Sequence, residues 1–152
     1  MAPPEFTAEL RHRLTLLADS FRRLAGTPLL APGGDLAEAL WHHPAAIVAH
    51  GTGGDPVFFF GNRAALIAFE LNFDAFTRLP SRLSAEPAVR AEREALLARV
   101  AATGIIRDYS GIRISATGRR FRIEQAVVWN LIDGAGVRHG QAAMFDPPNP
   151  EP

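Results

Sequence analysis

The chain has 152 residues and a mass of 16.5 kDa, with sixteen basic and sixteen acidic residues and therefore no formal net charge. This length is typical of one domain with a sizeable core, and the balanced charge argues against direct binding to nucleic acid or to an acidic membrane. The absence of cysteine and lysine excludes thiolate, disulfide, Cys-ligated metal and Schiff-base chemistry.

The ends of the chain predict where it resides. Met1–Glu5 lacks the basic and apolar regions of a signal peptide, and no stretch approaches the roughly 18 apolar residues of a membrane span. We therefore expect a cytoplasmic protein with no membrane partner. The proline-rich end predicts a disordered tail over residues 147–152.

The first two thirds of the chain predict mainly helices. Thr7 can cap a helix to about Ala25, whose apolar seam is formed by Leu10, Leu14, Leu17, Phe21 and Leu24. Further helical segments are expected at Leu36–His43, Arg63–Leu71, Asp74–Leu79 (capped by Asp74) and Val89–Ala102. Two short strands, Ala45–His50 and Val57–Phe60, interrupt them.

The last third of the chain predicts an antiparallel meander. Its strands are expected at Tyr109–Ser115, Arg119–Ile132 and Val137–Phe145, joined by glycine-containing turns. Strict alternation along the middle strand would place one set of residues on the same face: Phe121, Ile123, Gln125, Val127, Trp129 and Leu131.

This element order predicts an α+β fold: a PAS-like five-stranded antiparallel sheet with helices mainly on one face, plus an N-terminal amphipathic helix. We divide the chain into a flanking helix and loop (residues 1–34), a PAS-like domain (35–146) and the tail. The alternative is a cone-shaped nuclear-transport-factor-like fold, which usually places one helix between its early and late strands. Three helical segments between Asn62 and Ala102 favour the PAS-like order.

Several short strings are more specific than the element pattern. They are Asn62–Leu66 with Phe69–Glu70, Leu79–Glu86, Asp108–Ser115, and Gly118–Gln125 with Trp129–Leu131. In this order they resemble the MEKHLA domain family, over about Leu17–Phe145. That family is PAS-related, and occurs in small bacterial proteins and at the C-termini of plant class III homeodomain leucine-zipper proteins. The resemblance implies a sensory or interaction role without a defined activity.

PAS domains commonly hold a ligand between the sheet and the helices. Apolar walls with a few polar groups suit a small organic ligand, so we predict ligand-binding roles for Phe58, Phe60, Asn62, Phe69, Tyr109, Gln125, Trp129, Gln141 and Met144. Ordinary core packing is the competing interpretation of each. The cofactor is unknown: a flavin–cysteine adduct is excluded because there is no cysteine, and haem is disfavoured because Val89–Ala102 contains no histidine. A noncovalent flavin, a small organic molecule and an empty, fully packed core all stay open.

The segment Arg107–Arg122 is locally basic, and Arg113 with Arg122 could clamp an anion; the competing interpretation is a charged, solvated sheet edge. His42, His43 and His50 lack the spacing of a metal site, so no metal is predicted. Catalytic pairs such as His50 with Asp55, or Asp108 beside Tyr109, match no recognised motif, so no catalytic residue is predicted.

The leading hypothesis is therefore a noncatalytic sensory, small-ligand-binding or interaction module. The alternative is a small isomerase- or hydrolase-like enzyme with the cone-shaped fold. A homodimer through the N-terminal helix is expected from the PAS resemblance, and the competing interpretation packs the same seam on the chain's own sheet, over Val128 and Ile132.

Overall fold

The computed structural model describes residues 1–85 and 90–148. The helical elements are α1 (Ala8–Ala25), α2 (Leu36–His42), α3 (Arg63–Phe69), α4 (Phe73–Phe76), the 3₁₀ helix η1 (Ser81–Ser84) and α5 (Arg90–Thr103). The strands are β1 (Ala46–His50), β2 (Phe58–Gly61), β3 (Ile105–Ile114), β4 (Arg120–Ile132) and β5 (Arg138–Phe145). The first predicted residue of the long helix, Val89, and most of the predicted tail lie outside the described residues.

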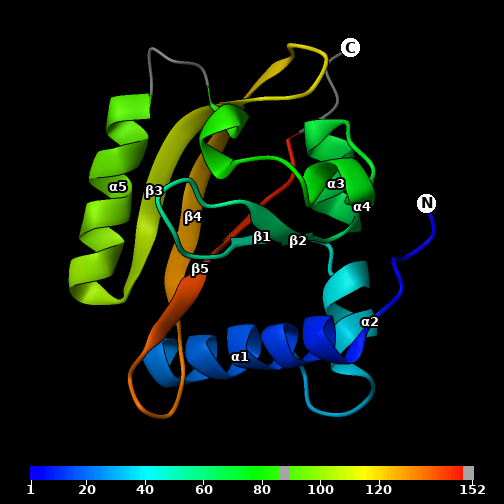
Figure 1. Cartoon of the computed structure of the whole chain (residues 1–152), viewed down its shortest axis with the longest axis vertical. Coiled ribbons are helices and arrows are strands. Elements are labelled where there is room, and N and C mark those ends of the chain that lie inside the picture. The colour runs from blue at the N-terminus through cyan, green and yellow to red at the C-terminus, as the bar shows by residue number, and fades with distance from the viewer. Residues whose placement is uncertain (86–89, 149–152) are drawn as a thin grey trace.

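The five strands form one antiparallel sheet in the order β2-β1-β5-β4-β3 (Figure 1). The first strand is therefore central and pairs with the last, as the PAS-like order requires. This arrangement confirms the predicted fold class. Within the described residues, no helix has the length and apolar character needed to cross a membrane.

Capping side chains fix the helix boundaries. The Thr7 hydroxyl accepts a hydrogen bond from the Leu10 amide at 3.1 Å, and Gly26 ends α1 in the left-handed conformation. The predicted cap at Asp74 is wrong by two residues. Asn72 caps α4 instead, accepting from the Ala75 amide at 2.8 Å, because an Asn at that position reaches the third amide of the turn.

A bulge in β4 reverses which side chains face which side of the sheet. Gln125 has a φ of +53°, and two β4 residues, Glu124 and Gln125, stand between the pairs Gly111↔Ile123 and Tyr109↔Ala126, where β3 has one. Phe121 and Ile123 therefore share the inner face, toward α3, with Ala126. The prediction that every second residue from Phe121 to Leu131 shares one face is therefore wrong, because the extra residue shifts the alternation of side chains between the two faces.

Each face of the sheet has its own helical layer. The inner face packs against α3 and α4, in a core that includes Phe58, Phe69 and Phe121. The opposite, outer face packs against α1 and α2, and Trp129 donates its indole N–H to the Leu17 carbonyl oxygen at 3.1 Å. Figure 1 shows α1 crossing one end of the sheet.

The apolar seam of α1 is buried within its own chain. Leu14, Leu17 and Phe21 lie in the outer core, and the Phe21 ring meets Trp129 edge-on at 5.0 Å. The seam therefore covers Trp129 and Leu131 rather than the predicted Val128 and Ile132. The β4 bulge explains this difference, because it exchanges the faces of these neighbouring residues.

Candidate functional site

A small cavity of about 60 Å³ lies between the inner face of the sheet and the segment formed by η1 and α5. Its walls are mostly aromatic and aliphatic. The lining residues come from every strand, from η1 and from the helices α3 and α5: Val48, His50, Phe58, Phe69, Ser81, Ser84, Leu97, Tyr109, Arg113, Ile123, Ala126, Val128, Gln141, Ala142, Ala143 and Phe145. An apolar hollow with a few convergent polar groups is the usual form of a small-molecule site.

The polar wall of the cavity is anchored to α5 through a buried pair of amides. Gln141 is only 2% exposed and donates through Nε2 to Asn130 Oδ1 at 3.2 Å. Asn130 in turn donates through Nδ2 to the Val100 carbonyl oxygen at 3.1 Å, and its Oδ1 also accepts from Arg138 Nε. This chain fixes the orientation of the Gln141 amide at the cavity.

Two further polar groups reach the cavity from other elements. His50, at the end of β1, contacts the Gly51 carbonyl oxygen through Nδ1 at 2.8 Å. The Ser84 hydroxyl donates to the Ser81 carbonyl oxygen at 2.6 Å, which closes the turn of η1. Sequence reasoning did not assign chemistry to either serine. The string Leu79–Glu86 was nevertheless one of those that carried the family resemblance.

The predicted ligand-binding residues divide into two groups. Phe58, Phe69, Tyr109 and Gln141 line the cavity, as expected of pocket residues. Phe60, Trp129 and Met144 belong to the core on the outer face, and Gln125 is exposed at the bulge. A register shift in the β1–β2 pair separates Phe58 from Phe60, because Val48 pairs with Gly61 whereas His50 pairs with Phe58.

Asn62 lies away from the cavity and is a structural residue in this fold. It is fully buried, and its Oδ1 accepts from the Ile47 and Ala65 amides at 2.9 and 3.1 Å. Its Nδ2 donates to the carbonyl oxygens of Leu40 at 3.1 Å and Ala45 at 2.8 Å. The side chain thus caps α3 and joins it to α2 and β1, which leaves little capacity for a ligand.

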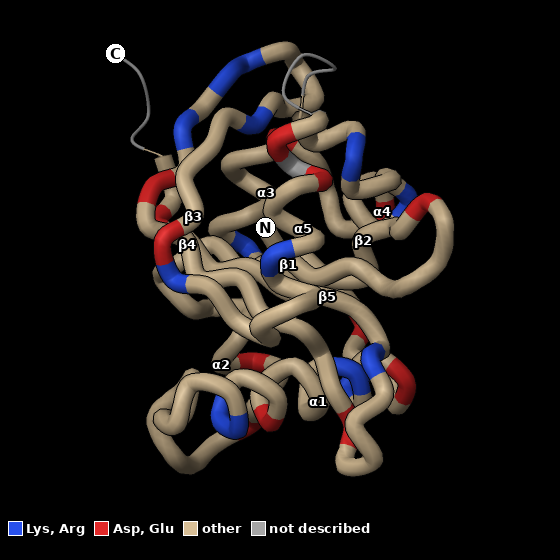
Figure 2. The backbone as a smooth tube through the Cα atoms, turned by 90° about the vertical axis from the view of Figure 1, so that its left-hand side faces the viewer, with Lys and Arg blue, Asp and Glu red and all other residues tan. Residues whose placement is uncertain are grey.

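The two arginines of the predicted anion clamp lie on opposite faces of the β3–β4 hairpin. Arg113 pairs with Phe121 and lines the inner cavity, with its guanidinium 5.2 Å from the centre of the Tyr109 ring. Arg122 points away from the cavity and bonds Glu124 at 2.9 Å. The clamp is therefore not formed by this pair, although basic residues do gather along the hairpin (Figure 2).

The histidines and acids considered for metal binding or catalysis are dispersed. Within the described part of the chain, no three His, Asp or Glu side chains are placed to hold a metal ion. Asp55 bonds Arg82 at 2.9 Å rather than His50, and Asp108 bonds Arg99 at 3.2 Å. These carboxylates are therefore engaged in surface ion pairs.

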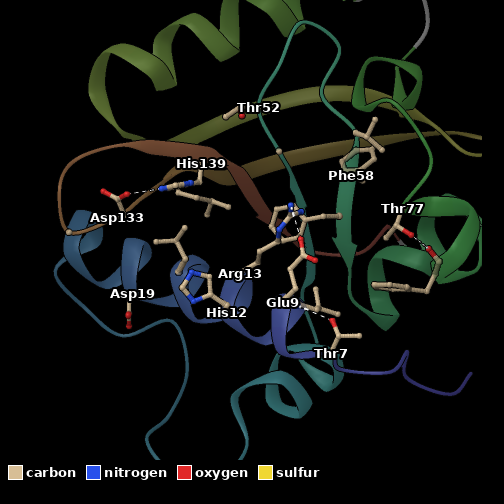
Figure 3. A pocket seen from close by; sticks show the side chains of 18 of the residues that line it. Thr7, Glu9, His12, Arg13, Asp19, Thr52, Phe58, Thr77, Asp133 and His139 are labelled. Atoms are coloured by element: carbon tan, nitrogen blue, oxygen red, sulfur yellow. Dashed lines mark hydrogen bonds and ion pairs between the residues drawn. The ribbon is translucent and has the colours of Figure 1, made fainter.

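A second hollow, a broad open groove, runs beside α1 and is also lined by residues of the β1–β2 and β4–β5 turns (Figure 3). Arg13 lies 4.8 Å from the centre of the Phe59 ring and 3.4 Å from Glu9. At the β4–β5 turn, His139 Nε2 lies 2.7 Å from Asp133 Oδ2, and this contact together with backbone amides lowers the pKa of Asp133. The charged side chains that line this groove are exposed and paired with one another. Such a groove suits contact with another protein surface more than binding of an enclosed ligand.

Solved structures with similar folds are PAS and light-oxygen-voltage domains. The PAS domain of a protein from Colwellia psychrerythraea has a TM-score of 0.61 at 14% identity, covering 72% of this chain and 90% of that one. The light-oxygen-voltage domain of the blue-light photoreceptor Aureochrome1 has a TM-score of 0.55 at 15% identity, covering 77% and 85%. At these identities the likeness establishes the fold alone.

A flavin does not fit the inner cavity. An engineered cavity of about 150 Å³ accommodates a single benzene ring, so about 60 Å³ cannot hold the three fused rings of a flavin. The chain also lacks the cysteine that a flavin adduct requires.

Curated relatives are plant homeobox-leucine zipper proteins of much greater length. Homeobox-leucine zipper protein ATHB-8 of Arabidopsis thaliana is 27% identical over 148 residues, which is 95% of this chain and 18% of that protein. HOX29 of Oryza sativa is 29% identical over 101 residues, 66% of this chain and 12% of its own length. The chain thus spans less than a fifth of these relatives.

The family comparison covers most of the fold described above. The model of the MEKHLA domain matches residues 11–147, from the first turn of α1 to just beyond β5. The chain therefore belongs to the MEKHLA domain family.

Proposed function

We propose that the protein is a noncatalytic sensory module of PAS type that binds a small ligand in the inner cavity. The observation that carries this proposal is the cavity itself, an apolar space on the inner face of the sheet with the buried amide of Gln141 in its wall. Membership of a PAS-related family supports a sensory role. The alternative enzyme hypothesis relied on a cone-shaped fold, which is not the fold observed.

The cavity restricts the size of the ligand. One molecule of liquid water takes up about 30 Å³. The cavity of about 60 Å³ therefore has room for roughly two water-sized groups, unless neighbouring side chains move. We therefore expect a small metabolite rather than a large planar cofactor.

Native mass spectrometry of freshly purified protein, followed by NMR titration with small organic fragments, tests this proposal. We expect a bound species, or shifts confined to resonances of cavity residues such as Ile123 and Ala126. Ala143→Leu should fill the cavity and abolish the response, while Ala18→Leu on α1 should leave it intact. A folded protein that carries nothing and responds to no fragment overturns the proposal and favours a protein-interaction module.

A further inference from the structure

Arg113 places a positive charge at a mostly apolar cavity. The β3–β4 register sets it on the inner face, two positions from Gly111 and four from Tyr109. Among the described residues that line the cavity, none is an Asp or Glu. In the described structure its guanidinium contacts only the Tyr109 ring and the Ile112 carbonyl oxygen, at 3.3 Å. By contrast, Arg11, Arg82 and Arg99 each bond a carboxylate.

Tyr109 and Gly111 hold this charge beside the cavity. The Tyr109 hydroxyl lies directly over Gly111, where an added Cβ would be only 2.3 Å from it. The ring therefore lies along β3, and its face meets the Arg113 guanidinium. No hydrogen bond to the Tyr109 hydroxyl is found among the described residues, so this O–H can donate to a ligand beside Arg113.

An unpaired guanidinium next to an apolar space selects for a particular ligand chemistry. Arginine presents a planar fork of N–H donors that matches the two oxygens of a carboxylate. Phe58, Phe69 and Ile123 supply the apolar walls for a short carbon chain. A doubly charged phosphate ester is less well matched, because Arg113 is the only arginine that lines the cavity in the described structure.

We propose that the inner cavity binds a short-chain monocarboxylate, with its carboxylate on Arg113 and Tyr109 and its chain among the three apolar walls. This inference rests on the proposed function and names the ligand class of the same site. Given the cavity volume, which admits roughly two water-sized groups, the chain should have about two carbons beyond the carboxylate.

Titration calorimetry and NMR with acetate, propionate, butyrate, valerate and hexanoate test the inference, with the matching primary amides as neutral probes at constant ionic strength. Affinity should rise and then fall along the series, and each amide should bind at least tenfold more weakly than its acid. Arg113→Gln should weaken carboxylate binding at least tenfold. Arg113→Lys, which keeps the charge without the fork, should give an intermediate loss.

Arg107→Gln is the matched control, because it removes the same charge from an exposed position of the same strand. Its carboxylate affinity should stay within twofold of the unsubstituted protein. Equal binding of acids and amides, or a folded Arg113→Gln protein with full affinity, would overturn the carboxylate assignment and leave the sensory proposal standing. Failure of acids, amides and fragments alike to bind would overturn both.

Discussion

Asn62 shows how much one polar side chain can organise in this molecule. Its amide joins the start of α3 to β1 and to the end of α2 through backbone groups that would otherwise be buried without partners. A cap of this kind is predictable from sequence, since Asn precedes a helical segment. Its reach to Leu40 and Ala45 is not, because those contacts depend on how three elements pack.

We expect Asn62→Ala to lower the free energy of unfolding by about 2–4 kcal/mol, because it leaves several buried backbone groups unsatisfied. Asn72→Ala is the matched control, since Asn72 is also an N-cap but is exposed. It should cost about 1 kcal/mol or less. Urea denaturation of both variants measures the difference, and equal losses would contradict the role assigned to Asn62.

At the scale of elements, the bulge at Gln125 decides which side chains of the second half of β4 face the cavity. Residues before it, such as Ile123, and residues after it, such as Ala126, share the inner face only because one extra residue lies between them. Simple alternation predicted the strand and its ends well. It could not predict the bulge, since a Gln with positive φ carries no sequence signature as clear as glycine.

Deleting Gln125 should prevent folding, because residues 126–132 would then present the opposite side chains to the cavity and to α1. Gln125→Gly keeps the bulge and relieves the positive φ, so it should leave stability unchanged or raise it by up to about 1 kcal/mol. Circular dichroism and thermal unfolding distinguish the two variants. A deletion variant with native stability would show that β4 tolerates either register.

The helix α1 is the second element whose role the structure decides. Its seam was predicted from spacing alone, and spacing cannot distinguish a partner helix from the sheet of the same chain. The structure buries Leu17 completely, and Ser20 Oγ accepts from the Ile132 amide at 2.8 Å. A homodimer through α1 stays a prediction, and it would have to use residues outside this seam.

We expect Leu17→Asp to destabilise the monomer fold by about 4 kcal/mol or more, because it buries a charge in the outer core. His12→Asp, on an exposed position of the same helix, should change stability by less than about 0.5 kcal/mol. Light scattering with circular dichroism reports association and folding together. A folded, monomeric Leu17→Asp protein derived from a dimeric parent would instead place the seam at a dimer interface.

At the scale of the whole molecule, three carboxylates join elements that are distant in sequence or meet at a turn. Hydrogen bonding from Arg11 lowers the pKa of Asp35, and the hydroxyls of Ser115 and Thr117 lower the pKa of Glu70. His139 lowers the pKa of Asp133 across the β4–β5 turn. Each folded pKa thus lies below the ordinary value of 3.8 for Asp or 4.5 for Glu.

A lowered folded pKa gives stability that is fully present above the unfolded pKa and is lost as the pH falls toward the folded value. We therefore expect the midpoint of urea unfolding to fall as the pH drops below about 4.5. The combined variant Asp35→Asn, Glu70→Gln and Asp133→Asn should show a flatter dependence. Asp19→Asn, at an exposed carboxylate, should retain the dependence of the parent, and an equally steep combined variant would contradict the assignment.

Phe58 lies between the two hollows described above, and this position connects them. Phe58 lines both the inner cavity and the open groove beside α1. Its ring stacks on the ring of Phe76, with 4.3 Å between the two ring centres. Phe58 is thus the described residue that the linings of the two hollows have in common. If a ligand in the inner cavity displaced Phe58, the wall of the outer groove would change with it, so we expect binding inside the fold to reach the surface without a hinge motion.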